Sequence, residues 1–351
     1  MVLSKEQKEI IETKESKVLV SCVAAAGKTA VLTERVKYLI DHGISSGKIV
    51  VITFTNAAAE EMTKRIGEKG KGVFIGTIHS YANYLLRSYG ISTNKIIKEE
   101  AFDELLPLIK ENLGCIQEVT HLLLDEAQDT DEEQFDFLIN KIKPENYFLV
   151  GDPRQTIYSW RGVDPDALFK LSMQNDVKTY TLNKNYRNGE KILYFAKNII
   201  NKLGFRYKDI SKSASGASGQ VIQIYYDLNS IYKFVTNPNY GTYKDWFILT
   251  RTNNQLSDIQ SFLKMKKVPC DTFKRADLSN EELNEKIQEN TVKILTIHTA
   301  KGLEAPNVIV VGALGYNDEE VRISYVAATR AKNNLIWTLP NYRKSKIKSW
   351  E

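Results

Sequence analysis

The chain has 351 residues and a formal net charge of +5, and 42% of its residues are apolar and 26% charged. This length predicts two domains, and the composition is sufficient for two hydrophobic cores. The small positive charge is compatible with a polyanionic partner without identifying one. Three scattered cysteines, Cys22, Cys115 and Cys270, argue against a disulfide framework or a paired metal motif. Because neither a signal peptide nor a membrane span is apparent, we expect a cytoplasmic protein without membrane contact.

Short apolar runs alternate with longer segments of helical period. The runs are Val18–Cys22, Ile49–Thr53, Leu122–Asp125, Tyr147–Gly151, Val177–Leu182, Trp246–Thr250, Val292–Thr296 and Val308–Gly312. Such strands separated by helices indicate parallel sheets covered on both faces. The predicted strands fall into two groups, which are separated near residues 183–219. This interval contains a predicted helix at 192–203 and a stretch of small, polar residues at 211–219, which we expect to be a mobile loop. We therefore predict two α/β domains, 1–178 and 179–351, with a solvated tail from Lys332.

The first apolar run leads into a motif typical of phosphate binding. Val18–Cys22 is followed by VAAAGKT and then by the helical sequence AVLTERVKYLI. Strand, tight loop, Lys-Thr and helix form the context that a P-loop requires, with loop amides and the helix N-terminus facing the phosphates. Lys28 would neutralise the β- and γ-phosphates, and Thr29 would hold Mg²⁺. The nucleotide contacts expected from this segment are Ala25, Ala26, Gly27, Lys28, Thr29 and Ala30.

This loop departs from the usual pattern G-x-x-x-x-G-K-[ST]. Cys22 stands at the first glycine position, and Gly27 is the only glycine left, preceded by Ala24, Ala25 and Ala26. Small residues still allow close approach of a phosphate, but a positive φ becomes costly without glycine. A lone GKT also occurs by chance, so the interpretation depends on the surrounding strand and helix.

The second half of the predicted site is LLLDEAQDT, residues 122–130. An apolar strand that ends in Asp125 and Glu126 places two carboxylates at the carboxyl edge of the sheet, where α/β proteins bind ligands. One carboxylate can hold the Mg²⁺ shell, and the next can orient and deprotonate water. The alternative is an acidic helix N-terminus. A helix N-terminus does not explain the two acids at the strand end. It does explain the acidic residues that come after them, which are Asp129, Asp131, Glu132 and Glu133.

Seven motifs in a fixed order reveal a resemblance that covers the chain from Gln7 to Ala331. They are TFTNAAAEEMTKRI (53–66), GTIHS (76–80), LLLDEAQDT (122–130), VGDPRQTIYSWRG (150–162), NYR (185–187), TIHTAKGLEAPNVIVVG (296–312) and ISYVAATRA (323–331). The chain resembles the UvrD/Rep-type superfamily 1A DNA helicases in a reduced form. The resemblance implies two RecA-like P-loop NTPase domains, each a mostly parallel sheet flanked by helices. It also implies an ATP-dependent, Mg²⁺-requiring translocase or helicase on single-stranded DNA, with 3′ to 5′ polarity and hydrolysis between the two motor domains.

The resemblance also implies roles for individual residues. Lys28, Thr29, Asp125 and Glu126 match the phosphate, Mg²⁺ and general-base positions. The other implied nucleotide contacts are Gln7 and Tyr186 at adenine, Glu304 at the ribose, and Gln155, Arg187 and Arg330 at the γ-phosphate. Arginines from a second domain would make hydrolysis depend on domain closure. Taken singly, each arginine is better explained as a surface salt-bridge partner, so its assignment rests on the motif around it.

A second set of residues matches the family's DNA-binding positions. Phe54, Tyr158 and Trp160 match aromatic residues on which bases stack, a contact that tolerates any sequence. Core packing is the alternative for Phe54. Polar positions along the expected DNA backbone path are Thr55, Asn56, His79, Arg161, Arg251 and His298.

The chain departs from the family in two short segments. Residues 83–120 and 252–291 are expected to be short insertions in the two motor domains, and they stand where the family has sizeable accessory subdomains. Translocation on single-stranded DNA, or on a 3′-tailed duplex, is therefore expected more strongly than processive unwinding, and a protein partner would supply duplex contacts or nuclease activity. Two alternatives stay open at this point. One is a DNA-binding adaptor subunit with weak hydrolysis that acts with a partner such as a nuclease. The other is an unrelated P-loop kinase or GTPase, which the motifs at 150–162 and 296–312 disfavour.

Overall fold

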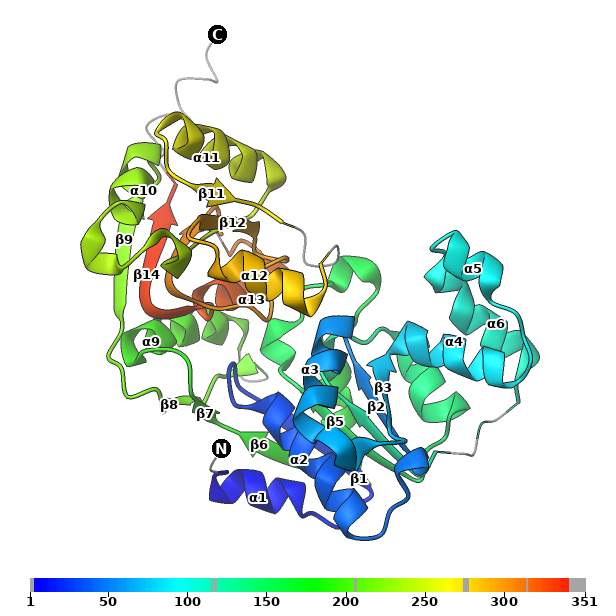
Figure 1. Ribbon diagram of the computed structural model, residues 1–351. Coiled ribbons are helices and arrows are strands. Elements are labelled where there is room, and N and C mark those ends of the chain that lie inside the picture. The colour runs from blue at the N-terminus through cyan, green and yellow to red at the C-terminus, as the bar shows by residue number, and fades with distance from the viewer. Residues whose placement is uncertain are drawn as a thin grey trace. The chain divides into compact units, whose positions relative to one another are not determined.

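The computed structural model describes residues 3–114, 116, 119–204, 207–273, 278–313 and 315–340. It divides into two compact units, whose helices and strands are labelled in Figure 1. The first unit comprises residues 1–22 and 26–182, and the second comprises residues 23–25 and 183–351. The boundary expected after residue 178 falls at the start of β6 (Lys178–Leu182), which pairs with the first sheet. Cys115 lies outside the described residues.

The first unit is built on a six-stranded sheet in the order β3-β2-β4-β5-β1-β6, and every paired strand in it is parallel. This confirms the predicted α/β class. Because β4, β5 and β1 are neighbours in that order, the residues that follow their carboxyl ends lie at one edge of the sheet. The strands before β6 are β1 (Lys17–Cys22), β2 (Ile49–Thr53), β3 (Phe74–Thr77), β4 (His121–Leu124) and β5 (Asn146–Gly151).

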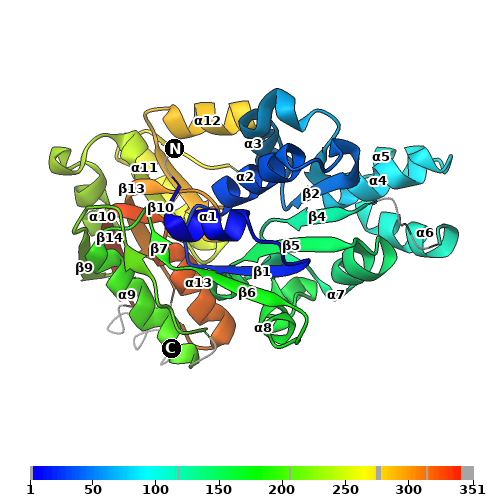
Figure 2. The ribbon, with the colours of Figure 1, turned by 90° about the horizontal axis from the view of Figure 1, so that it is seen from below.

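Helices cover both faces of the first sheet. Figure 2 shows α2 and α3 on one face and α7 and α8 on the other. Threonines cap two of the helices that follow strands: the Thr55 hydroxyl accepts from the amide of Ala58, and the Thr77 hydroxyl accepts from the amide of Ser80. A π-helical segment at 136–141 continues α7. The α-helices are α1 (Lys5–Ile11), α2 (Lys28–Asp41), α3 (Asn56–Ile66), α4 (Ile78–Ser88), α5 (Asn94–Lys98), α6 (Leu105–Asn112), α7 (Glu132–Phe135) and α8 (Ala167–Ser172).

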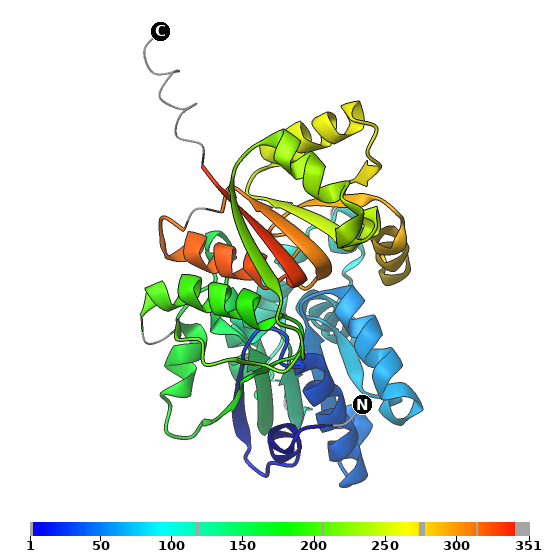
Figure 3. The same cartoon turned by 90° about the vertical axis from the view of Figure 1, so that its left-hand side faces the viewer.

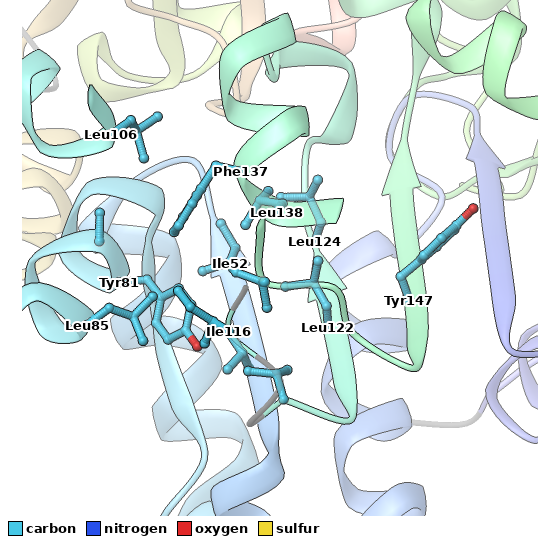
Figure 4. Packing of buried hydrophobic residues seen from close by; sticks show 14 of the residues in the cluster. Ile52, Tyr81, Leu85, Leu106, Ile116, Leu122, Leu124, Phe137, Leu138 and Tyr147 are labelled. Atoms are coloured by element: carbon cyan, nitrogen blue, oxygen red, sulfur yellow. The ribbon is translucent and has the colours of Figure 1, made fainter. Parts of the chain in front are cut away.

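The short segment 83–120 packs onto the core of the first unit. Figure 4 shows Tyr81 and Leu85 of α4 directed toward the strand residues Ile52 and Leu122, with Phe137 beside them. The buried cluster also takes in apolar residues of α5, α6 and the chain that follows: Ile96, Leu105, Leu106, Ile109, Leu113, Ile116 and Val119. In its described residues, the segment is therefore part of the hydrophobic core of the first unit.

The second unit repeats the architecture with a six-stranded parallel sheet in the order β11-β12-β10-β13-β14-β9. Helices α9 and α13 cover one face, and α10 and α11 cover the other (Figure 3). The strands are β7 (Lys184–Asn185), β8 (Lys212–Ser213), β9 (Gln220–Tyr225), β10 (Trp246–Thr250), β11 (Cys270–Asp271), β12 (Val292–Thr296), β13 (Ala305–Val311) and β14 (Ala331–Leu339). The helices are α9 (Glu190–Ile200), α10 (Leu228–Val235), α11 (Asn253–Met265), α12 (Asn280–Gln288) and α13 (Asp318–Ala328).

Three expectations about the second unit need correction. The tail from Lys332 is not a solvated end through residue 339, because those residues continue β14 and bury Leu335 and Ile336. The stretch 211–219 is held by hydrogen bonds and is not a mobile loop. Strand β8 pairs with β7, and the hydroxyls of Ser213 and Ser215 both donate to the carbonyl oxygen of Asn188. Within 252–291, α11 and β11 belong to the domain core, since α11 packs on β10 and β12 and β11 pairs with β12.

No helix among the described residues is long and apolar enough to cross a membrane.

Candidate nucleotide and nucleic-acid sites

The loop between β1 and α2 has the geometry expected of a phosphate-binding turn. Gly27 precedes α2 with a φ of 82°, and no side chain caps the first turn of the helix. Ala25 also adopts a positive φ, 54°, where glycine would be free of strain. A left-handed alanine costs about 1 kcal/mol. The loop therefore keeps the required backbone shape despite its single glycine, and the strain is concentrated at Ala25.

Gln7 lies against this loop, although twenty residues separate them in the sequence. A capping box with Ser4 begins α1 and fixes the side chain of Gln7, which is 2% exposed. Its Nε2 donates to the carbonyl oxygen of Ala26 at 3.3 Å. A Cβ added to Gly27 would lie 3.0 Å from the same Nε2, so a side chain at this position would have to displace the Gln7 amide slightly in addition to adopting a positive φ.

Lys28 and the acidic pair meet at the edge of the first sheet. The Nζ of Lys28 lies 2.6 Å from Oε2 of Glu126. Burial alone would lower the pKa of Lys28, but the carboxylates of Glu126 and Asp125 outweigh burial and raise it. Burial and the neighbouring Glu126 raise the pKa of Asp125 to about 7, although Lys28 opposes them. Glu126 itself has a φ of 51°, the kind of backbone strain that clusters at functional sites.

Asp152, at the end of β5, organises the neighbouring part of the site. Its Oδ2 accepts from Nε2 of Gln155 at 2.8 Å, and its Oδ1 accepts from Nε of Arg154 at 2.6 Å. Arg154 in turn donates from Nη2 to the carbonyl oxygen of Cys22 at 2.5 Å, where β1 ends. Gln155, predicted at the γ-phosphate, is thus tied to the strand end beside the loop. Neither Asp152 nor Arg154 was predicted as a site residue, although both lie within the motif VGDPRQ beside Gln155.

The second unit brings together the other predicted nucleotide residues. Nε of Arg187 donates to Oε2 of Glu304, and its Nη1 donates to the carbonyl oxygen of Thr329 at 3.2 Å. The Nζ of Lys332 lies 2.7 Å from Oε1 of Glu304. Burial alone would raise the pKa of Glu304, but Arg187 and Lys332 outweigh burial and lower it. Lys332, which sequence analysis assigned to a solvated tail, therefore belongs to this cluster.

Arg330 is buried, whereas the side chain of Tyr186 is exposed. Arg330 is 2% exposed and donates to the carbonyl oxygens of Val326 and Leu303 and to the hydroxyl of Thr329. Tyr186 has an exposed ring, and its backbone amide donates to the carbonyl oxygen of Ala25 at 3.2 Å. Ala25 belongs to the loop segment 23–25, which clusters with the second unit.

An aromatic row is formed by residues that follow two strands: Phe54 comes after β2, and Tyr158 and Trp160 lie in the chain after β5. The rings of Phe54 and Tyr158 stack with centroids 5.5 Å apart, and Tyr158 meets Trp160 edge-on at 6.5 Å. The guanidinium of Arg161 lies 5.9 Å from the Trp160 ring centroid. Phe54 is 40% exposed and Trp160 is 70% exposed, so neither ring is part of the core. The three predicted stacking residues therefore form one surface with a cation at its end.

The remaining predicted DNA residues are distributed over both units. Thr55 caps α3, and Asn56 begins that helix with its side chain exposed. His79 lies on α4 beside the exposed ring of Phe102, with centroids 6.3 Å apart, and burial lowers its pKa. In the second unit, Arg251 follows β10 and donates to Oε1 of Glu320 at 2.7 Å. His298 lies half-buried in the turn after β12.

The residues predicted to hold Mg²⁺ fit that ion by their chemistry. Thr29 offers a hydroxyl and Asp125 a carboxylate, which are hard oxygen ligands. Among the described residues, no group of three or more His, Cys, Asp and Glu side chains could hold a metal ion. Mg²⁺ is commonly bound through one or two carboxylates together with phosphates and water, so a sparse protein contribution agrees with it.

The chain is similar to known proteins over most of its length. Residues 3–113 and 113–177 match the UvrD/REP helicase N-terminal domain, and residues 270–342 match the UvrD-like helicase C-terminal domain. A probable DNA helicase of Mycoplasma pneumoniae is 26% identical over 95% of this chain and 82% of its own length. Gabija protein GajB of Bacillus cereus is 23% identical over 93% of the chain and 94% of its own length.

The ATP-dependent DNA helicase PcrA of Staphylococcus epidermidis is 26% identical over 76% of the chain. The chain spans about half the length of this relative, 50%. The alignment with the Mycoplasma protein extends over 451 residues, more than the 351 residues of the chain, so that relative carries segments absent here. These matches cover the motifs of both units, and the chain belongs to the UvrD-like helicase family.

Proposed function

We propose that this chain is a DNA-dependent ATPase that translocates along single-stranded DNA in the 3′ to 5′ direction. One observation carries the proposal: the first sheet presents the Lys28–Glu126 pair after β1 and β4, and the aromatic row of Phe54, Tyr158 and Trp160 after β2 and β5. A nucleotide site and a base-stacking surface on one sheet allow hydrolysis to be coupled to DNA movement. The polarity follows from the family resemblance, and the substrates are ATP and single-stranded DNA.

The chemistry assigned to the first unit is water attack on the γ-phosphate of ATP. Glu126 would take the proton from the attacking water, while the bond from the γ-phosphorus to the leaving ADP oxygen breaks. Lys28 would balance the phosphate charge, and Gln155 would contact the γ-phosphate. Thr29 and Asp125 would hold Mg²⁺, which supplies further charge neutralisation. The roles of Arg187, Glu304 and Arg330 stay predictions from the resemblance.

The decisive experiment measures ATP hydrolysis by the purified chain with and without a homopolymeric DNA strand. We expect hydrolysis that requires Mg²⁺, stops when EDTA removes it, and is stimulated by single-stranded DNA. A duplex of the same length with blunt ends serves as the comparison, because a stacking surface needs unpaired bases. Hydrolysis without DNA stimulation would contradict the coupling. Absence of hydrolysis with intact DNA binding would favour the adaptor described below.

Replacing Trp160 by alanine is expected to weaken binding of single-stranded DNA by about 1–3 kcal/mol, the range for one stacked base. The reason is the exposure of this ring at the end of the aromatic row, where it supports no core residue. Fluorescence anisotropy with a labelled oligonucleotide at several salt concentrations measures the loss, and wild-type affinity should fall with salt through counterion release.

Tyr194→Ala is the matched control, because Tyr194 is an equally exposed ring on α9. Binding of a fluorescent ATP analogue should change little in either variant. Normal DNA binding by Trp160→Ala would remove the residue from the proposed surface.

A DNA-binding adaptor subunit with weak hydrolysis is the second candidate function. The departure of the loop from the usual pattern, with one glycine and a left-handed Ala25 at a φ of 54°, is the observation that favours it. Such a subunit would act with a partner such as a nuclease. The complete set of Lys28, Glu126 and Gln155 at one sheet edge argues for the motor instead.

A further inference from the structure

Gln128 joins the ends of two strands at the proposed hydrolysis site. It lies in the short turn at 127–129 after β4, and its side chain is 2% exposed. Its Nε2 donates to Oε2 of Glu126 at 2.5 Å and to Oδ2 of Asp129 at 3.2 Å. Its Oε1 accepts from the backbone amide of Asp152 at 2.9 Å, at the end of β5. A single buried amide therefore connects β4 and β5.

The orientation of this amide is dictated by its surroundings. The backbone amide of Asp152 is a donor, so only the carbonyl oxygen of Gln128 can face it. The amino group must then face the two carboxylates, which accept but do not donate when ionised. The chain leaves room for this arrangement at Gly151, where an added Cβ would lie 2.8 Å from Oε1 of Gln128. Glutamate would keep the acceptor but lose the donor.

Glu126 also accepts a hydrogen bond from Lys28, but Lys28 is the residue predicted to bind the phosphates of ATP. Lys28 donates to Oε2 of Glu126, the same oxygen that Gln128 contacts. When ATP binds as proposed above, Lys28 is needed at the β- and γ-phosphates. Gln128 then still donates to Glu126, whose left-handed backbone is strained, and can keep its carboxylate in place. A neutral donor suits this task, because it fixes a carboxylate while lowering its basicity less than a cation does.

We propose that Gln128 is a positioning residue that holds Glu126 in place for water activation after Lys28 has moved to the nucleotide; this rests on the proposed function. The same amide connects Glu126 with Asp152, whose Oδ2 accepts from Gln155. The general base and the predicted γ-phosphate contact are thereby held by one hydrogen-bonded chain, Glu126–Gln128–Asp152–Gln155. This chain lies wholly within the first unit.

The test compares Gln128→Glu, which keeps the acceptor for Asp152, with Gln128→Met, which removes both contacts. Steady-state ATP hydrolysis is measured with saturating single-stranded DNA, and affinity with a fluorescent ATP analogue. We expect kcat to fall about 10- to 100-fold in both variants, as for other residues that orient catalytic groups. The KM for ATP and the analogue's Kd should change by about twofold at most, since Gln128 contacts Glu126 and not the nucleotide. Gln174→Glu, the same change at an exposed residue of the first unit, should have no effect.

A double substitution separates positioning from a merely structural role. If Gln128 acts through Glu126, Gln128→Glu should add no further loss to the residual turnover of Glu126→Gln. Unchanged kcat in both single variants, or multiplied losses in the double variant, would overturn the inference. Loss of nucleotide binding together with hydrolysis would assign Gln128 a structural role only and would overturn it too. Absence of DNA-stimulated hydrolysis in the unsubstituted chain would instead overturn the proposed function, and the inference with it.

Discussion

Replacing Glu126 by glutamine is expected to lower ATP turnover by about 10²–10⁴-fold, the usual contribution of a general base. Glutamine has the same shape but cannot take a proton from water. Its amide oxygen can still accept from Lys28, whose Nζ now lies 2.6 Å from Oε2 of Glu126. The loop geometry and the affinity for ATP should therefore persist, and the variant should accumulate in an ATP-bound state. Single-turnover hydrolysis and equilibrium binding of a fluorescent analogue measure the two quantities separately.

The matched control is Glu133→Gln, an exposed acid in the first turn of α7 on the same unit. It removes an identical charge from the acidic run that the alternative interpretation would treat as helix-stabilising. Turnover should be unaffected in this control. Equal losses in the two variants, or full turnover in Glu126→Gln, would show that Glu126 is not the base.

The purified chain is expected to move along single-stranded DNA but to unwind long duplexes poorly. The described part of 83–120 packs into the first core, and α11 and β11 of 252–291 belong to the second core. Little of the described part of these two segments is left to form a surface that contacts a duplex. Separating each base-pair step costs about 1.4 kcal/mol, which a motor without such a surface must obtain from thermal fraying. Strand displacement should therefore fall steeply as the duplex lengthens.

Two assays on one preparation test this expectation. Streptavidin displacement from a biotinylated single strand reports translocation, and strand displacement from 3′-tailed duplexes of increasing length under single-turnover conditions reports unwinding. Glu126→Gln provides the control without hydrolysis. Efficient unwinding of long duplexes by the chain alone would show that the reduced core is sufficient. Unwinding that appears only with an added protein would identify the partner that supplies the duplex contacts.

Secondary structure and site residues could be predicted from the sequence where they depend on residues close by in the chain. The strand–loop–helix around Gly27 and Lys28 and the acidic strand end at Asp125 were both predictable, because hydrophobic runs and loop residues determine them directly. The polar start of β14, Lys332-Asn333-Asn334, was misleading for the opposite reason. Those residues form a strand because β13 and β9 lie on either side, and such pairing depends on distant segments.

The same distinction explains the missed residues of the site. Gln128 stands among acids in LLLDEAQDT, and nothing nearby in the sequence indicates that its partner is the amide of Asp152, twenty-four residues later. The serines at 211–219 have loop-like composition, yet two of their hydroxyls donate to Asn188 and fix the segment. Composition describes how a segment behaves in isolation, and a tertiary hydrogen bond can override that preference.

The alanines of the phosphate-binding loop have a consequence for the entropy of ligand capture. A glycine-rich loop samples many backbone conformations and loses that freedom when it closes around an anion. Ala24, Ala25 and Ala26 restrict those conformations, and Ala25 has a left-handed φ of 54° in the folded chain. The conformational cost of this left-handed φ, about 1 kcal/mol, therefore belongs to the free energy of folding and is not added when a phosphate binds. A stiff, preorganised loop gives up less entropy on binding, which favours faithful recognition of one phosphate geometry over accommodation of several.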